Sequence, residues 1–533
     1  MKIRLIVAGF ATVLLAAGHA LAQDSHSAHG SAEKVGTVNF ANSCAPAVQA
    51  DLASGVAMLH SFWYSAGGKK FNDVLAKDPG CAIADWGIAA LLMSNPLAGV
   101  GSTPADAMAA QKAIDAGRAT GAKTQRERDY IEAVAAYYQD WAATPEGTRQ
   151  QRRATAFEAL AARYPADDEA QIFTALYIAG TQSQSDQTYA AYFKAADILE
   201  KQHIKYPDHP GISHYLIHAY DAPPIAARGL TAARRYAGLA PDAPHALHMP
   251  SHIFSRVGAW EESAATNQRS FNAAIPGNEL GEAYHASDYM VYADLQLGRD
   301  AAALAAMQTV MKLVMPASLP PPAAYASSAM PARFAVERAD WEAASRLVPP
   351  KGGAPHTDAL VWFAHSVGAA RIGDVAAARQ GAAELETRHA ALVAAKNTYW
   401  ATEVEIQQRE VAAWIAYAEK NPTLGLKLAR EAADMEDRNE KHIITPGRIL
   451  PARELLGDML FENGQPALAL VEYEQSQNRE PNRFRGIYGA ARAAEAAGDK
   501  AKAKAYYARL LDQAKTADSP RPELILAKAY VSR

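Results

Sequence analysis

The stretch LLGDMLFENGQPALALVEYEQSQNREP, residues 455–481, is followed by YGAARAAEAAGDKAKAKAYYARLL, residues 488–511. Both contain an apolar helix-forming segment, a glycine, and a second alanine-rich segment that carries an aromatic residue. Gly464 pairs with Gly498, and Tyr473 with Tyr507, each 34 residues apart. A glycine between two helix-forming segments predicts two antiparallel helices, and its recurrence predicts a repeat.

Less regular copies of this unit occur along most of the chain. They lie at residues 71–92, 155–176, 188–209, 254–271, 292–307 and 360–382. The unit resembles the tetratricopeptide repeat, whose period is also 34 residues, and the resemblance covers most of residues 45–520. The chain as a whole is also similar to a group of secreted bacterial repeat proteins with no established reaction.

The resemblance implies an all-α fold. Because one helix pair cannot bury its apolar face alone, successive pairs stack around a continuous core. We expect a right-handed α-solenoid, a superhelix of stacked antiparallel helix pairs, with the first helix of each pair on the concave side. Such a groove generally holds a peptide or a partner protein.

Composition marks the boundaries of the array. The proline-rich stretch 314–333 cannot continue a helix, so it predicts a loop or a joint between two arrays. A second break is expected at 442–453. The expected segments are a signal peptide (1–22), a flexible segment (23–44), an N-terminal array with a histidine-rich groove (45–313), the proline-rich loop (314–333), middle helical repeats (334–441), and a C-terminal repeat pair with a tail (442–533).

The first residues have the pattern of a secretory signal. Lys2 and Arg4 precede an apolar stretch shorter than the roughly 20 residues of a membrane span, and an A-x-A cleavage site ends at Ala22. We therefore expect a periplasmic or secreted protein, cleaved after Ala22. In an oxidising compartment Cys44 and Cys81 are expected to form a disulfide, the alternative being two unpaired buried thiols.

Composition also limits the partners. The 533 residues are 49% hydrophobic and 21% charged, which is enough for a large core in a soluble protein. The net charge of −4 and the lack of a long basic run argue against nucleic acid as a partner. No segment after the signal predicts a membrane span.

Two histidine pairs stand one repeat apart. HYLIH, residues 214–218, and HMPSH, residues 248–252, each place two histidines four residues apart. Residues four apart share one face of a helix, and equivalent positions of stacked repeats lie side by side. We therefore expect His214, His218, His248 and His252 to form a two-by-two patch in the groove.

This patch predicts a metal site. Neutral imidazole is a common ligand of transition metals, so zinc or copper is expected on the four paired histidines, with nickel and iron(II) as further options. The motif H-E-x-x-H is absent, and Pro250 inside the predicted helix could distort the face. The alternatives are a polar ligand-binding groove or purely structural histidines. Alignment of the repeats adds further groove residues: His245, His285, Asp288 and Tyr292.

Weaker candidates lie elsewhere on the expected groove. His60 follows an apolar helix and stands beside Phe62, so core packing is the alternative to a ligand-binding role. In the last two units Glu454, Arg485 and Arg492 take groove positions. Arginine there favours a carboxylate or phosphate ligand, and the alternative is a solvated charged face.

Three functions follow from these patterns. The first is an exported repeat scaffold that binds a partner or ligand in its groove and carries a transition-metal site. The second is a metal-dependent enzyme acting on a small ligand enclosed by the superhelix. The third is a protein-interaction scaffold without metal. The sequence identifies no substrate and assigns no catalytic residue.

Overall fold

The computed structural model describes residues 33–313 and 320–533 of the chain. The chain divides into two units, Met1–Glu33 and Lys34–Arg533, and every described helix belongs to the second. The predicted signal peptide (1–22) and residues 23–32 of the expected flexible segment lie outside the described residues. Both expectations therefore stay predictions.

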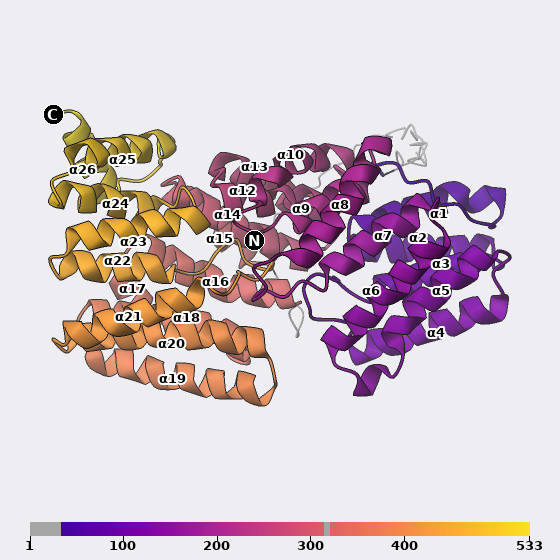
Figure 1. Ribbon diagram of the computed structural model, residues 1–533, viewed down its shortest axis with the longest axis horizontal. Coiled ribbons are helices and arrows are strands. Elements are labelled where there is room, and N and C mark those ends of the chain that lie inside the picture. The colour runs from indigo at the N-terminus through magenta and orange to yellow at the C-terminus, as the bar shows by residue number, and fades with distance from the viewer. Residues whose placement is uncertain (1–32, 314–319) are drawn as a thin grey trace, which may run out of the picture. The chain divides into compact units, whose positions relative to one another are not determined.

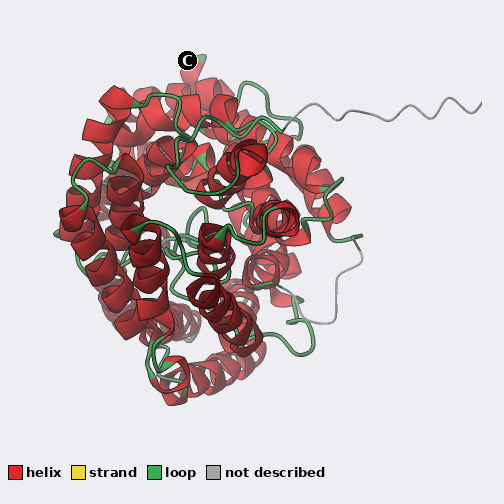
Figure 2. Ribbon diagram, turned by 90° about the vertical axis from the view of Figure 1, so that its right-hand side faces the viewer, coloured by secondary structure: helices red, strands yellow, loops and turns green. Residues whose placement is uncertain are grey.

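The described part of the second unit contains helices and loops and no strand (Figures 1 and 2). Its N-terminal helices are α1 (Gln49–His60), α2 (Tyr64–Lys77), α3 (Ala82–Leu91), α4 (Pro104–Thr120), α5 (Gln125–Tyr138), α6 (Glu146–Arg163), α7 (Asp168–Ala179), α8 (Ala190–Lys205), α9 (Pro210–Ala219), α10 (Leu230–Leu239), α11 (Pro244–His248), α12 (Pro250–Val257), α13 (Trp260–Ala274), α14 (Leu280–Gln296) and α15 (Asp300–Val310). Short 3-10 helices are η1 (Pro46–Val48), η2 (Trp141–Ala143) and η3 (Ala226–Gly229).

The remaining helices complete the array. They are α16 (Pro321–Glu337), α17 (Trp341–Ser345), α18 (Pro355–Arg371), α19 (Val375–Ala394), α20 (Thr398–Ala418), α21 (Pro422–Glu436), α22 (Ala452–Glu462), α23 (Pro466–Arg479), α24 (Phe484–Ala496), α25 (Lys500–Gln513) and α26 (Pro522–Val531). Helices that follow one another pack in pairs, such as α18 with α19 and α20 with α21, and alternate helices such as α18 and α20 also touch. The predicted all-α solenoid of stacked helix pairs is confirmed.

The turn glycines explain the 34-residue period. Gly464 and Gly498 have φ of 72° and 85°, in the left-handed region that favours glycine. Each ends one helix and reverses the chain, and the helices that follow begin at Pro466 and Lys500, again 34 residues apart. The side chain of Asp499 then accepts a hydrogen bond from the backbone N–H of Lys502 (3.0 Å) and caps the second helix.

The proline-rich stretch differs from its prediction. Residues 314–319 lie outside the described part, but residues 321–333, expected to be loop, belong to α16. Pro321 and Pro322 occupy the first turn, where no N–H is needed for the helix. Pro331 lies inside α16, and packing of this helix against α14 and α18 outweighs its missing hydrogen bond. The expected loop at 314–333 is therefore wrong for its helical part.

The expected break near 442–453 is a buried inner segment. Residues 437–451 connect α21 to α22 without regular helix, and Ile443, Ile444 and Thr445 are each at most 8% exposed. The hydroxyl of Tyr289 on α14 lies 3.0 Å from the carbonyl oxygens of Ile443 and Thr445. Arg333 on α16 donates to the carbonyl oxygen of Arg448 (2.9 Å). The segment therefore fills space that an open groove would leave to a ligand.

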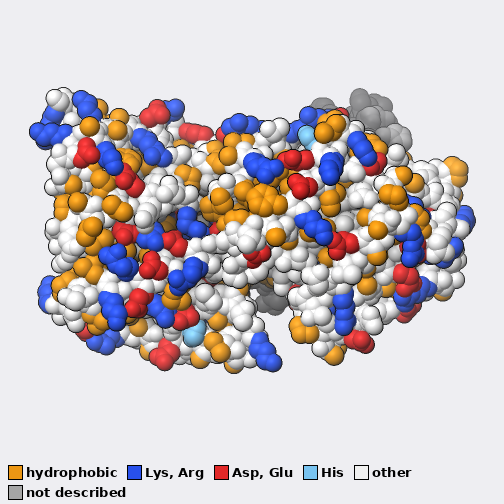
Figure 3. Space-filling model, in the orientation of Figure 1, with side chains coloured by type: hydrophobic (Ala, Val, Ile, Leu, Met, Phe, Trp, Pro, Cys, Tyr) orange, Lys and Arg blue, Asp and Glu red, His pale blue; other side chains and the backbone are white. Residues whose placement is uncertain are grey.

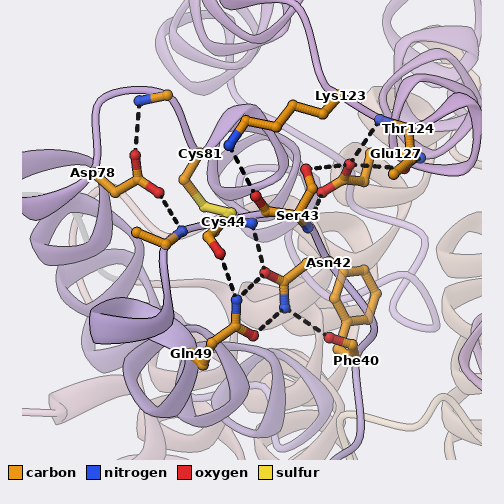
Figure 4. Close-up of a disulfide and its surroundings, with 12 residues drawn as sticks. Phe40, Asn42, Ser43, Cys44, Gln49, Asp78, Cys81, Lys123, Thr124 and Glu127 are labelled. Atoms are coloured by element: carbon orange, nitrogen blue, oxygen red, sulfur yellow. Dashed lines mark hydrogen bonds between the residues drawn. A yellow bond between two sulfur atoms is a disulfide. The ribbon is translucent and has the colours of Figure 1, made fainter.

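The N-terminal end of the array is held by a disulfide. Cys44 and Cys81 are bonded, with their Cα atoms 4.8 Å apart, so the linkage joins the segment before α1 to the start of α3 (Figure 4). Around it, Asp78 accepts a hydrogen bond from the backbone N–H of Ala45 (2.7 Å), and Glu127 accepts one from that of Ser43 (2.8 Å).

Charged side chains of both signs are interspersed over the face drawn in Figure 3. This mixture gives no broad field of one sign on that face. Among the described helices, none combines the length and apolar character required to cross a bilayer.

Candidate metal centre

Six buried histidines gather on four helices. α9 and α11 both begin at a proline, which suits a first helical position because its missing N–H would have no partner there. Each of the six side chains is at most 7% exposed. The rings come from α9 (His214, His218), α11 (His245, His248), α12 (His252) and α14 (His285).

Pro250 does not distort the face that carries His248 and His252. Met249, before the proline, keeps helical angles of φ −51° and ψ −37°, and its N–H still donates to the carbonyl of His245 (2.9 Å). Because Pro250 is the first residue of α12, α11 and α12 follow one helical path. The Nε2 atoms of His248 and His252 therefore lie 3.1 Å apart.

The six rings form two groups. Each group has one ligand nitrogen per ring, and these nitrogens lie within 4.8 Å of one another. The predicted two-by-two patch does bring His218 and His252 together, with ring centroids 5.5 Å apart. The structure nevertheless favours two sites of three histidines over one ion shared by the four paired histidines. In each site, a third ring from a helix later in the chain joins the two histidines of an i,i+4 pair. The first triad is His214, His218 and His245, and the second triad is His248, His252 and His285.

Hydrogen-bond acceptors fix the protons on two rings of the second triad, His248 and His252. The Nδ1 atom of His252 lies 2.9 Å from the Asp221 carboxylate, so it carries the proton and donates it. The Nδ1 atom of His248 lies 2.7 Å from Oδ1 of Asn267. The amide of Asn267 cannot be reversed without loss, because its Nδ2 donates to the carbonyl of Ser263 (2.7 Å). Nδ1 of His248 is therefore a donor too.

These assignments leave two lone pairs facing each other. With both protons on Nδ1, the Nε2 atoms of His248 and His252 are acceptors 3.1 Å apart, a contact that no hydrogen bond can satisfy. A proton shared between them is opposed by burial, which lowers the pKa of His252 and holds that of His248 well below 6.5. Two nitrogen ligands at about 2.0–2.1 Å from one ion lie about 2.9–3.4 Å apart for angles of about 90–109°. The observed separation fits a shared cation.

The Asp221 carboxylate orients the ring of His252 in this arrangement. Burial would raise its pKa, but Lys441, Arg256 and His252 hold it well below the usual value, so the carboxylate is ionised. Arg256 donates to its Oδ1 (2.8 Å), and His252 donates to its Oδ2 (2.9 Å). A carboxylate that orients a ligating imidazole is a common outer partner of metal sites.

The first triad has a similar but looser frame. His214 donates from Nδ1 to the carbonyl of His60 (2.6 Å), and Nδ1 of His245 lies 3.2 Å from a carboxylate oxygen of Glu282. The Nε2 atoms of His214 and His218 are 3.2 Å apart. Nδ1 of His218 and Nε2 of His245 are buried without a hydrogen-bond partner among the described residues.

A cavity of about 700 Å³ reaches both triads. Its wall includes His218 and His245 of the first triad and His252 and His285 of the second. The rest of the wall is largely apolar and aromatic, with two carboxylates, Glu279 and Glu282. It comes from the turn into α2, the loop at residues 94–100, the start of α14, the start of α16 and the inner segment. These further lining residues include Phe62, Trp63, Leu280, Pro321, Ile443 and Ile444.

Several residues predicted to line an open groove are paired in the interior. Asp288 lies 3.3 Å from the Arg333 guanidinium, and α14 is covered by α16, α24 and the inner segment. The open groove expected at Asp288 and Tyr292 is therefore wrong, because α16, α24 and the inner segment cover α14. The paired residues are Asp288 with Arg333, Tyr292 with Glu480 and Arg483, Glu454 with Arg483, and Arg485 and Arg492 with Asp458.

His60 belongs to a separate cluster. Its Nε2 lies 2.9 Å from one oxygen of Glu169, and Nε2 of His209 lies 3.0 Å from the other. The hydroxyl of Tyr215 lies 2.8 Å from Nδ1 of His60. Burial lowers the pKa of His60 to about 4, which keeps the ring neutral. This cluster lies outside the cavity wall.

The outer partners of the triads could not be found from sequence. Asp221 and Glu282 are visible as nearby carboxylates, but nothing in the sequence assigns them to a particular histidine. Asn267 lies on α13 within an ordinary repeat, and Lys441 lies in the inner segment, far away in the chain. Their roles depend on contacts between residues 19 to 220 positions apart, for which the sequence carries no local signal.

Comparisons with known proteins give no family. No protein-family model matches the chain, and no curated protein matches it. Among solved structures the chain is similar to the crystal structure of the APC/C hetero-tetramer Cut9-Hcn1, at 10% sequence identity and a TM-score of 0.29, covering 90% of this chain and 95% of that chain. This similarity is too low to say anything about function, and the chemistry of the site follows from its own geometry.

Proposed function

We propose that the protein is an exported helical-repeat protein that binds a divalent transition-metal ion at the second triad and presents it to a cavity. One observation supports this most directly: two Nε2 lone pairs, on His248 and His252, face each other at 3.1 Å. A cation between them converts an unfavourable contact into two coordinate bonds. His285 supplies the third ligand.

Three neutral imidazoles suit zinc or copper in particular. Both metals accept imidazole nitrogen, and three protein ligands leave at least one coordination position for an outside molecule. His252 and His285 both border the cavity, so that position is within reach of a ligand.

The cavity favours a small molecule over a peptide. Its volume of about 700 Å³ lies in the range of small-molecule sites, and the inner segment occupies space that a peptide in the concave groove would need. A metal ion held by these histidines would act as a Lewis acid and would lower the pKa of a coordinated water toward about 7, which would supply a nucleophile. This supports metal-dependent chemistry on a small ligand as the second candidate function.

Export is supported by two features. The sequence begins with a signal-like stretch, and the cysteines at 44 and 81 are bonded, which suits an oxidising compartment. Fractionation of cells that express the full chain should place the protein outside the cytoplasm, and removal of residues 2–22 should retain it inside. Equal distribution of both forms would refute export.

The metal proposal is tested by loading the purified chain. Protein stripped with a chelator is incubated with zinc or copper, desalted and analysed by elemental mass spectrometry. Retention of at least one ion per chain is expected, and one ion fewer in a double variant, His248→Gln with His252→Gln, would support the second triad. A metal-free wild type, with unchanged thermal unfolding in added metal, would refute the proposal and leave a scaffold without metal.

A further inference from the structure

We propose that the first triad binds a second transition-metal ion, so that the six histidines form a dinuclear centre whose two ions face one cavity. The inference rests on the proposed function of the second triad. It can be tested separately from that function, because the first triad consists of other residues and has its own set of hydrogen-bond partners.

The first triad offers two lone pairs by fixed hydrogen bonding. His214 donates from Nδ1 to the carbonyl of His60 (2.6 Å), so its Nε2 is an acceptor. His245 places Nδ1 3.2 Å from the Glu282 carboxylate, which leaves its Nε2 as an acceptor as well. That Nε2 is buried and has no hydrogen-bond partner among the described residues. A buried acceptor without a donor is costly, and a metal ion would satisfy it.

His218 completes the set from the same helix face as His214. Its Nε2 lies 3.2 Å from Nε2 of His214, a separation that fits two ligands of one ion. Its Nδ1 has no partner among the described residues, so without an ion its proton lies on Nε2 and is donated to Nε2 of His214. Ligation requires that proton to move to Nδ1, where no neighbouring donor blocks it. Phe62 packs against His214 and His245, with ring centroids 4.4 Å and 5.4 Å away, and holds both rings in place.

The two triads are close enough to form one centre. Ring centroids of His218 and His252 are 5.5 Å apart, and those of His245 and His248 are 6.0 Å apart. Two rings of each triad border the same cavity. One molecule in that cavity can therefore reach both ions.

Charge is distributed to match two cations. Each triad has one carboxylate as an outer partner, Glu282 for the first and Asp221 for the second. Asp221 is also paired with Arg256 and lies 3.6 Å from Lys441, and Glu279 is a further carboxylate in the cavity wall. Two divalent ions would therefore still leave a net positive charge at the centre. A small anion is the outside ligand that this balance favours.

Zinc stoichiometry tests the inference without any variant. Apo protein is titrated with zinc by calorimetry, then desalted and measured by elemental mass spectrometry. Two ions per chain are expected. One ion would overturn the second site and leave the proposed function intact, whereas none would overturn both.

Matched variants assign the ions to the triads. His245→Gln is expected to bind one zinc, and His285→Gln is also expected to bind one, while His209→Gln, in the separate Glu169 cluster, should still bind two. Two ions in His245→Gln would show that the second ion lies elsewhere and would overturn the assignment. Far-UV circular dichroism compares the folding of each variant with wild type.

Copper reports whether the two ions are neighbours. In the Cu(II)-loaded wild type we expect electron paramagnetic resonance to show a magnetically coupled pair, and in His245→Gln an isolated ion. Two uncoupled signals in the wild type would overturn the dinuclear centre.

Discussion

The Glu169 cluster and the six-histidine cluster contain similar side chains, but they differ in whether each hydrogen-bond donor faces an acceptor. In the Glu169 cluster two imidazole Nε2–H groups meet one carboxylate, and the Tyr215 hydroxyl donates to the remaining nitrogen of His60. Each of these contacts joins a donor to an acceptor. In the second triad, by contrast, two acceptors face each other at 3.1 Å.

This difference separates a structural cluster from a ligand-binding one. Both clusters are buried, and both contain histidines close enough to an acidic or imidazole neighbour to resemble a metal site. Distances and burial alone do not distinguish the two clusters. The position of each proton distinguishes the two clusters. The contacts of the Glu169 cluster each join a donor to an acceptor, and Nδ1 of His209 is left without a partner among the described residues, whereas the second triad brings two acceptors together.

The largest expected effect is the loss of a ligand. His252→Gln should weaken zinc binding by about 1,000-fold, or about 4 kcal/mol, because even outer partners of metal ligands contribute 10–100-fold. Calorimetric titration measures it. His209→Gln is the matched control and should leave zinc affinity unchanged. Similar losses in the two variants would remove the distinction between the clusters.

Glu169→Gln should affect stability instead of metal affinity. Burial alone would raise the pKa of Glu169, but the two imidazoles lower it to about 2 from the usual 4.5. A lowered carboxyl pKa stabilises the fold above pH 4.5, and this contribution is lost as the pH falls toward 2. The variant should therefore be about 3 kcal/mol less stable at pH 7.

Denaturant unfolding at several pH values checks this prediction. The difference between wild type and Glu169→Gln should be constant between pH 6 and 7 and should narrow below pH 4.5. A difference that grows as the pH falls would contradict the assigned ionisation of Glu169.

Loss of an outer partner should have a smaller effect. Asn267→Leu removes the acceptor that holds Nδ1 of His248 and should weaken zinc binding 10–100-fold. Asn272→Leu, at an exposed position of the same helix, is the control and should bind zinc as wild type does. If both variants bind zinc normally, the tautomer of His248 is not set by Asn267.

The smallest effect is expected from Tyr215→Phe. The change removes one hydrogen bond to His60 in the Glu169 cluster and should lower the free energy of unfolding by about 1 kcal/mol. Zinc stoichiometry should not change. A lower zinc content in this variant would show that the two clusters depend on each other.

The sequence by itself determined the repeat and the pairing of the histidines. Glycines 34 residues apart set the turns, and the spacing of four between His214 and His218, and between His248 and His252, placed each pair on one helix face. These features depend on local geometry, in which a helix repeats every 3.6 residues, so they can be derived without contacts between distant segments.

Only the tertiary structure decided what surrounds those histidines. Asn267, Asp221 and Glu282 set the protons on His248, His252 and His245, and the inner segment closes space that the repeat alone would leave open. The direction of each hydrogen bond and the burial of each ring are set by contacts between helices that are distant in the chain. The same spacing of histidines is therefore compatible with a cluster held by hydrogen bonds alone or with a metal centre.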